Sequence, residues 1–357
     1  MTRLECLPLE EWPARDREAW ERACQPRAGL WDTAGAAVDL RPHTRRNYQR
    51  AYGIWLAHLR DVGDLHPAEG PGTRITPARA ERWVEAMQAA GRKSGTIHLY
   101  LICLHAILQL MAPGAETGFL LRPGGRTLAR AFPQRAKPFP PHDSLDLLRE
   151  VDALHARGLA AATFHARITD LRDAALMGLL LAYMPRIGDA AGMRIGVNLL
   201  LQPHGLWLVR FPAETTKGKR DLEYELDPRR SRLITDYLEM ARPGFRGAGG
   251  TDMVWMGHHG RPLDHVGATG VFRRRTREWL GEEHGPHMAR KWLTSTAARL
   301  SPEAAADAAL VAGHSLAVSQ KHYREATSLH AGIRHGRHIK SLRRATEGVV
   351  ERLWNER

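Results

Sequence analysis

Apolar residues recur at helical spacing through most of this chain, and this period constrains its fold more than any other feature. The repeat runs through residues 44–59 and again through residues 168–179, where it is long enough to define helices. Strand signals are confined to about residues 197–226 and 253–256. The sequence therefore predicts a mainly α protein with one small antiparallel β-sheet.

Helix boundaries and one hairpin can be placed from local signals. Thr76 and Pro77 are typical of an N-cap followed by the first helical residue, and Gly91 is typical of a helix end. Two apolar runs, residues 206–211 and 222–226, flank a polar segment that contains glycine, as in a β-hairpin.

Four further helices are expected in the last third of the chain. Asp227-Pro228 predicts a helix start, and helices are expected over about 266–280, 287–299 and 302–312, the last ended by Gly313.

A basic segment separates two helical regions. No acidic residue occurs between Glu116 and Asp143, while five prolines and five basic residues do: Arg122, Arg126, Arg130, Arg135 and Lys137. Such a composition indicates a linker that lies against phosphate groups, and a linker that is merely solvated is the alternative.

Composition favours a nucleic-acid partner. The 357 residues carry a formal charge of +13, and the pI is near 10.2. Such a charge favours polyanions through counterion release. The length predicts two domains. The chain has no long apolar run and carries acids near its start, so we expect a cytoplasmic protein without a membrane partner.

Neither metal nor nucleotide chemistry is indicated. Cys6, Cys24 and Cys103 form no C-x-x-C pair, and His258-His259 has no partners at metal-ligand spacing. Phosphate-binding and serine-hydrolase motifs are also missing from the sequence. We therefore expect no metal and no cofactor.

Several chemically active residue types follow one another in a fixed order. The set is Arg186 with Asp189, Lys217 in the hairpin turn, His287-x-x-Arg290, Gly313-His314 and Tyr323. Its spacings alone are weak evidence, because His43, Arg46 and Tyr52 reproduce two of them. Tyr52 lies on the apolar stripe of a helix, so we interpret it as a core residue.

The order as a whole resembles the tyrosine recombinase (phage integrase) family over residues 41–330. The resemblance implies a SAM-like helical core-binding domain, which clamps DNA together with a mostly helical catalytic domain. We then expect five parts: an N-terminal extension of unknown role (1–38), the core-binding domain (39–118), the basic linker (119–141), the catalytic domain (142–330) and a basic tail (331–357).

The resemblance, together with side-chain chemistry, implies a role for each residue of the set. Arg186 and Arg290 bind the scissile phosphate in planar forks and stabilise its pentacoordinate state. Tyr323 attacks phosphorus to form a 3′-phosphotyrosine. Lys217, with Lys219 as the alternative, is the general acid toward the 5′-oxygen.

Three other residues assist. His287 accepts the tyrosine proton, His314 hydrogen-bonds the phosphate, and Asp189 orients the catalytic groups. The chain departs from the family pattern at Met184, where glycine is usual, at Pro185, and at Lys291, where histidine is frequent. The first two departures affect the turn that aims Arg186.

The resulting expectation is a site-specific DNA recombinase or integrase of a mobile element, acting as a tetramer on double-stranded DNA. The basic tail packs on a neighbouring protomer in this interpretation, or folds back on its own domain in the alternative. Beyond the linker, DNA contacts are expected from Arg45, Arg46, Arg273 and Arg274. For the last two, a merely solvated helix face is the alternative. Two alternatives remain open: DNA relaxation like that of a type IB topoisomerase, and a non-catalytic DNA-binding accessory protein.

Overall fold

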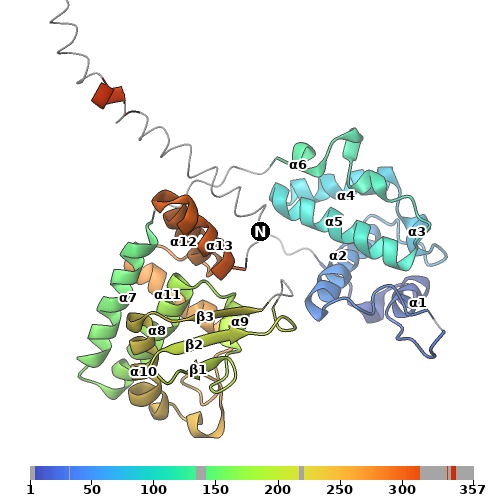
Figure 1. Cartoon of the computed structure of the whole chain (residues 1–357). Helices are drawn as coiled ribbons and strands as arrows, with labels where there is room; N and C mark the ends of the chain where they lie inside the picture. The colour runs from blue at the N-terminus through green and yellow to red at the C-terminus, as the bar shows by residue number, and fades with distance from the viewer. Residues whose placement is uncertain are drawn as a thin grey trace, which may run out of the picture. The chain divides into compact units, whose positions relative to one another are not determined.

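The structure is a computed structural model that describes residues 5–31, 33–133, 142–216, 221–313, 336 and 339–342. The chain forms two compact units, Met1–Lys137 and Pro138–Arg357 (Figure 1). Of the residues that the sequence analysis assigns to the site, Lys217, His314 and Tyr323 lie outside the described residues, as do Lys219, Arg135 and Lys137.

The described part of the first unit is helical. Its elements are η1 (Leu9–Glu11), α1 (Ala14–Ala23), α2 (Pro42–Asp61), α3 (Pro71–Arg74), α4 (Pro77–Ala89), α5 (Ser94–Met111), η2 (Gly118–Leu120), η3 (Pro123–Gly125) and α6 (Leu128–Ala131). The predicted cap of α4 is present, because the Thr76 hydroxyl accepts the Arg79 N–H at 3.3 Å and Pro77 is the first helical residue. Gly91 follows with φ +69°, a conformation that favours glycine.

Helix α5 is the apolar centre of this unit. It is as long and as apolar as a membrane-crossing helix, with a mean hydropathy of 1.4 over 18 residues. It packs against α2, however, and buries one stripe of side chains, among them Ile97, Leu101, Leu104 and Leu108. This is how a core helix behaves.

The core of the first unit includes residues that the sequence analysis placed in the extension and the linker. Trp12 and Trp20 from the N-terminal segment are buried in it, as are Leu120, Leu128 and Phe132. The reason is that apolar side chains alternate with the arginines of the basic segment. The apolar side chains point inward, while Arg122, Arg126 and Arg130 are exposed. Residues 119–133 therefore belong to the folded unit.

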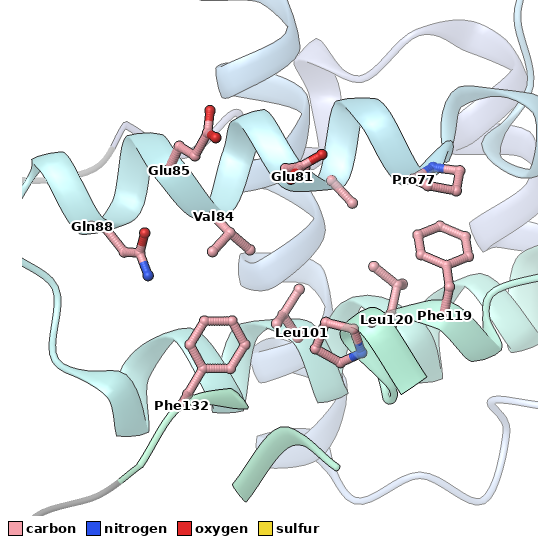
Figure 2. Close-up of a pocket in the computed structure, with 12 residues that line it drawn as sticks. Pro77, Glu81, Val84, Glu85, Gln88, Leu101, Phe119, Leu120 and Phe132 are labelled. Carbon is pink, nitrogen blue, oxygen red and sulfur yellow. The ribbon is translucent and has the colours of Figure 1, made fainter. Parts of the chain in front are cut away.

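A cavity of about 400 Å³ lies between α4, α5 and this added segment. Figure 2 shows Val84 from α4 facing Leu101 from α5, with Leu120 and Phe132 from the segment after α5 beside them. The lining is mostly apolar, and Glu81, Glu85 and Gln88 add polar groups along α4.

A fully buried ion pair fixes the N-terminal segment to the rest of the first unit. Asp16 on α1 accepts hydrogen bonds from Arg74 Nη2 at 2.9 Å and from the Tyr52 hydroxyl. Both charged side chains are 0% exposed. Arg74 also donates to the carbonyls of His66 and Glu69 at 2.7 and 2.6 Å, so its guanidinium is well satisfied.

The second unit surrounds one buried helix. Its elements are α7 (Ser144–Leu159), α8 (Phe164–Ala182), α9 (Ile187–Ala191), β1 (Leu199–Leu201), β2 (Trp207–Phe211), β3 (Leu222–Glu225), α10 (Pro228–Asp236), η4 (Tyr237–Ala241), η5 (Arg242–Gly244), η6 (Ala248–Gly250), α11 (His265–Leu280), α12 (His287–Leu300) and α13 (Pro302–Val311). Every residue from 170 to 181 of α8 is buried, and α7, α10 and α12 pack around it. Residues 174–181 are apolar or glycine on all sides of the helix, as such burial requires, whereas the buried charges of α8 lie in the turn before them, at Asp170, Arg172 and Asp173.

The predicted hairpin is present within a three-stranded antiparallel sheet of order β1-β2-β3. Its register pairs Val209 with Tyr224 and Phe211 with Leu222. Alternate residues of β2 (Trp207, Val209 and Phe211) are buried, as the two-residue period of a strand requires. Residues 253–256, also predicted as a strand, form only isolated β-bridges, in which Met253 pairs with Arg194 and Met256 pairs with Pro262.

A buried charge network joins α8 to α11. The Asp173 carboxylate receives hydrogen bonds from Arg172, Arg274 and Arg275 at 2.6 to 3.0 Å. Burial works to raise the pKa of Asp173, but the three positive charges outweigh burial and lower that pKa. Part of the arginine cluster on α11 thus stabilises the fold.

The Asp16–Arg74 pair gives a stability test of the N-terminal segment. We expect Asp16→Asn to lower the free energy of unfolding by about 3 kcal/mol, because it removes the buried partner of the Arg74 charge and leaves only the partly exposed Glu69, at 3.8 Å. Glu18→Gln on the same helix is the control, since the Glu18–Arg22 pair is exposed. Urea denaturation of the full chain measures both, and equal midpoints for the two variants would contradict the structural role of this segment.

Candidate active site

A left-handed turn positions the first arginine of the site. Helix α8 ends at Ala182, and Met184 then adopts φ 53°, the only positive φ of a non-glycine residue in the described ranges. Pro185 has no backbone N–H with which to continue helix α8. Arg186 is then the N-cap of the short helix α9. Met184 therefore has the conformation that glycine favours at this position.

The second arginine is held by the same turn. His287 and Arg290 begin α12 one helical turn apart, with His287 exposed and Arg290 only 8% exposed. The Arg290 Nη2 donates to the Met184 carbonyl at 2.7 Å. Through this hydrogen bond, the turn at Met184 joins the end of α8 to the start of α12. It thereby brings together two arginines that are 104 residues apart in the sequence.

The two guanidinium groups repel one another. The pKa of Arg290 is lowered to about 10, first by burial and then by the positive charge of Arg186, while Asp189 and Tyr224 act in the opposite direction. The Arg186 carbonyl accepts the Ala190 N–H at 2.8 Å, but its guanidinium makes no hydrogen bond or ion pair with another residue of the described ranges, the i, i+3 neighbour Asp189 included. The arrangement has an excess of positive charge and an open guanidinium, which suits an anion such as a phosphodiester.

Tyr224 is a neighbour of the site that the sequence analysis missed. It lies on β3, stacks on Tyr183 with ring centroids 4.9 Å apart, and interacts electrostatically with Arg290 and Asp189. Its buried hydroxyl has no hydrogen-bond partner among the described residues. The alternation of side chains along β3 could have indicated that Tyr224 faces inward, but not that it lies near Arg290.

The Tyr183–Tyr224 stack ties the hairpin to the end of α8. The Tyr183 hydroxyl accepts the Asp227 N–H at 2.6 Å and donates to the Asp227 carboxylate at 3.1 Å. Asp227 also caps α10 by accepting the Arg230 N–H at 3.0 Å, as its position before Pro228 predicted. The root of the hairpin is therefore fixed beside the arginines.

The residues that flank the undescribed positions lie close to this site. Lys217 belongs to the loop between Phe211 and Leu222, whose ends pair in the sheet, and the Ala213 N–H donates to the Asp221 carboxylate at 2.8 Å. Gly313, which precedes His314, has φ +59°, and a Cβ built there would lie 3.4 Å from the Leu222 side chain. The chain thus leaves α13 beside β3, two residues from Tyr224.

The predicted DNA-binding residues fall into two groups. Arg46, Arg122, Arg126, Arg130 and Arg273 are exposed. Arg45 instead donates to the Ala37 and Val38 carbonyls at 3.1 and 3.3 Å, and Arg274 pairs with Asp173 at 2.6 Å. The last two have intramolecular partners, which no local pattern could indicate because those partners are distant or belong to the backbone.

Solved structures with the same fold are tyrosine recombinases. The Tn1549 transposon integrase in complex with transposon right end DNA matches with a TM-score of 0.57 and 14% identity, over 82% of this chain and 94% of that one. The XerH site-specific recombinase bound to a palindromic difH substrate matches with a TM-score of 0.56 and 13% identity, over 90% and 97%. No protein-family model and no curated protein sequence matches this chain. The mainly α recombinase fold expected from the sequence is confirmed.

The left-handed conformation of Met184 can be tested without reference to activity. We expect Met184→Gly to be more stable than Met184→Ala by about 1 kcal/mol, because alanine keeps the steric cost of a positive φ. Ala153 is exposed within α7 and serves as the control position, where glycine is expected to be the less stable residue. Chemical denaturation measures both differences, and the same order at the two positions would contradict the turn geometry.

Proposed function

We propose that this protein cleaves and rejoins DNA through a 3′-phosphotyrosine, as a site-specific recombinase of a mobile element. One observation carries the proposal: Arg186 and Arg290 converge from distant segments at an open, positively charged site. The fold shared with tyrosine recombinases supports it, as does the order of Lys217, His314 and Tyr323 in the sequence.

The chemistry assigned to each group balances without a cofactor. Arg186 and Arg290 hold the two non-bridging oxygens of the scissile phosphate. The Tyr323 oxygen attacks phosphorus while the bond to the 5′-oxygen breaks. His287 takes the tyrosine proton, and Lys217 gives a proton to the departing oxygen. Because a phosphodiester bond replaces another, attack by a 5′-hydroxyl of the partner strand reverses the step and releases the tyrosine.

Other tyrosines of the chain are poor candidates for the nucleophile. Burial raises the pKa of Tyr48, Tyr52, Tyr183, Tyr224 and Tyr237. A raised pKa reduces the fraction of the reactive phenolate. Tyr100 is in the first unit, where it packs beside Trp83. These properties favour Tyr323, in agreement with its spacing from His314.

Recombination is favoured over DNA relaxation by the first unit. The unit is helical and carries the exposed arginines of the basic segment, which together would form a second DNA-binding surface. A tetramer on paired sites, with the tail 331–357 contacting a neighbouring protomer, completes the proposal. The protein would act in the cytoplasm on double-stranded DNA.

The nucleophile is tested with a trapped cleavage product. A binding site is first selected from randomised duplex DNA, and the selected site is then nicked close to each cleavage position so that the released fragment diffuses away. We expect the wild type to form a covalent adduct at a DNA 3′-end, and Tyr323→Phe to form none, because phenylalanine has no nucleophile. Denaturing gel electrophoresis of end-labelled DNA measures the adduct.

The control addresses the set His43, Arg46 and Tyr52, which has the same spacings. Tyr52→Phe is expected to keep adduct formation at a temperature at which the variant is folded, because Tyr52 is fully buried. An adduct with Tyr323→Phe would show that another residue attacks. Relaxation of a supercoiled plasmid that lacks the selected site would favour the topoisomerase alternative, and binding without any adduct would favour the accessory protein.

The exposed arginines of the basic segment are tested by the salt dependence of binding. Replacing Arg122, Arg126 and Arg130 together by glutamine is expected to reduce the slope of log K against log salt by roughly 2.7, which is three phosphate contacts at about 0.9 each. The control replaces Arg22, Arg149 and Arg229, which already pair with acids. Equal slopes for the two triple variants would contradict DNA contact by this segment.

A further inference from the structure

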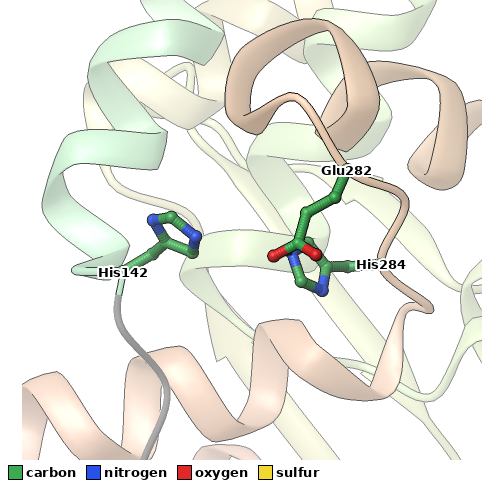
Figure 3. A group of neighbouring side chains, drawn as sticks. All are labelled: His142, Glu282 and His284. Carbon is green, nitrogen blue, oxygen red and sulfur yellow. The ribbon is translucent and has the colours of Figure 1, made fainter.

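Two histidines and one glutamate converge beside the start of α12. His142 lies two residues before α7, next to its N-cap Asp143, while Glu282 and His284 lie in the loop between α11 and α12 (Figure 3). One ligand atom from each residue lies within 4.8 Å of the other two, and His284 Nε2 is 3.2 Å from Glu282 Oε1. The sequence analysis expected no metal site, because 140 residues separate His142 from Glu282.

Both histidines are held in place by contacts that do not involve each other. The neighbouring Asp143 accepts hydrogen bonds from Thr296 and Arg299 of α12 at 3.1 and 2.9 Å, which fixes the backbone at His142. The backbone N–H of His284 donates to the Thr276 hydroxyl at 3.0 Å, which fixes the loop.

The buried Trp292 forms an apolar floor under both imidazoles. Its ring lies 6.0 Å from that of His142 and 5.2 Å from that of His284, nearly perpendicular to each. The buried His284 Nε2 lies 3.2 Å from Glu282 Oε1, at an angle that does not make a hydrogen bond. A ring nitrogen that faces a carboxylate without a hydrogen bond between them is suited to share a cation with it.

We propose that His142, Glu282 and His284 bind a zinc ion, with a fourth position open to water. Two imidazole nitrogens and one carboxylate oxygen are a set that zinc prefers. Bonds of 2.0 to 2.2 Å in a tetrahedron require ligand atoms about 3.3 Å apart. The His284–Glu282 pair already has this separation. Glu282 is two-thirds exposed, so its carboxylate can adjust its position relative to the two imidazoles.

The zinc would join the segment that enters the second unit to the loop that leads into α12. That loop continues directly into His287 and Arg290, so an occupied site would hold the first turn of α12 and, if the proposed function is right, the proton acceptor His287 and the phosphate-binding Arg290. The zinc would be structural, because none of its ligands is among the residues that carry the proposed chemistry.

Binding is tested on the full, tag-free protein after chelator treatment. Titration with Zn²⁺ in a calorimeter is expected to give one equivalent, and Co²⁺ is expected to give the visible bands of a tetrahedral site. Both His284→Gln and the exposed Glu282→Gln are expected to weaken binding at least tenfold. His258→Gln is the matched control: His258 stacks on His165 with ring centroids 4.5 Å apart, without a carboxylate in the group.

Two outcomes would overturn the zinc site: unchanged binding by Glu282→Gln and His284→Gln, or loss of binding by His258→Gln. A structural role further requires that zinc slow hydrogen exchange of residues 281–290 in the wild type but not in Glu282→Gln. The Tyr323-dependent adduct is measured separately in the presence of chelator and is expected to persist there. Failure of the zinc site and failure of the proposed function are therefore distinguishable.

Discussion

The hydrogen bond from Arg290 to the Met184 carbonyl is the interaction on which the candidate site depends. It requires Met184 to reverse the chain in a left-handed conformation, which for an L-residue with a side chain costs about 1–2 kcal/mol. The Met184 side chain is fully buried against alanines of α12 and α13, and this packing offsets part of the cost. The turn at Met184, helix α12 and helix α13 thus form a single structural element. Arg186 and Arg290 can face one another only while that element is intact.

The two like charges of this site raise the free energy of the folded state, and a bound anionic substrate would relieve that cost. The lowered pKa of Arg290 means that its positive charge destabilises the folded state at neutral pH, and that this cost is lost as the pH rises through about 10. A phosphodiester between the two guanidiniums would remove this repulsion and raise that pKa again. Around Asp173 in the same unit, by contrast, three arginines share one carboxylate. The positive charges that support the fold share a carboxylate, whereas positive charge remains in excess at Arg186 and Arg290, where an anion is expected.

Local chemistry made much of the fold predictable, whereas contacts between distant residues did not. Thr76 and Asp227 cap the helices that their sequence context indicated, and the hairpin has the expected strands, because each of these signals acts within a few residues. The burial of Asp16 against Arg74 could not be read from the sequence, because nothing local marks either residue as one of a buried pair. The basic segment misled for a related reason. Its composition is that of a linker, but three buried apolar side chains suffice to attach residues 119–133 to the core of the first unit. For the site, the order of residue types indicated Arg186 and Arg290, and only the fold added Tyr224 and the Met184 carbonyl.

The two sets with matching spacings show what the fold contributes to such an interpretation. His43, Arg46 and Tyr52 lie on one helix, but Tyr52 is completely buried with its hydroxyl on Asp16, and burial raises its pKa. A phenol in that environment cannot reach DNA or ionise easily, whatever its distance in sequence from a histidine. The later set differs because Arg290 meets a second arginine that the spacing does not include. Because a phosphate needs charges on more than one side, this convergence of Arg186 with Arg290 is what makes the later spacing chemically meaningful.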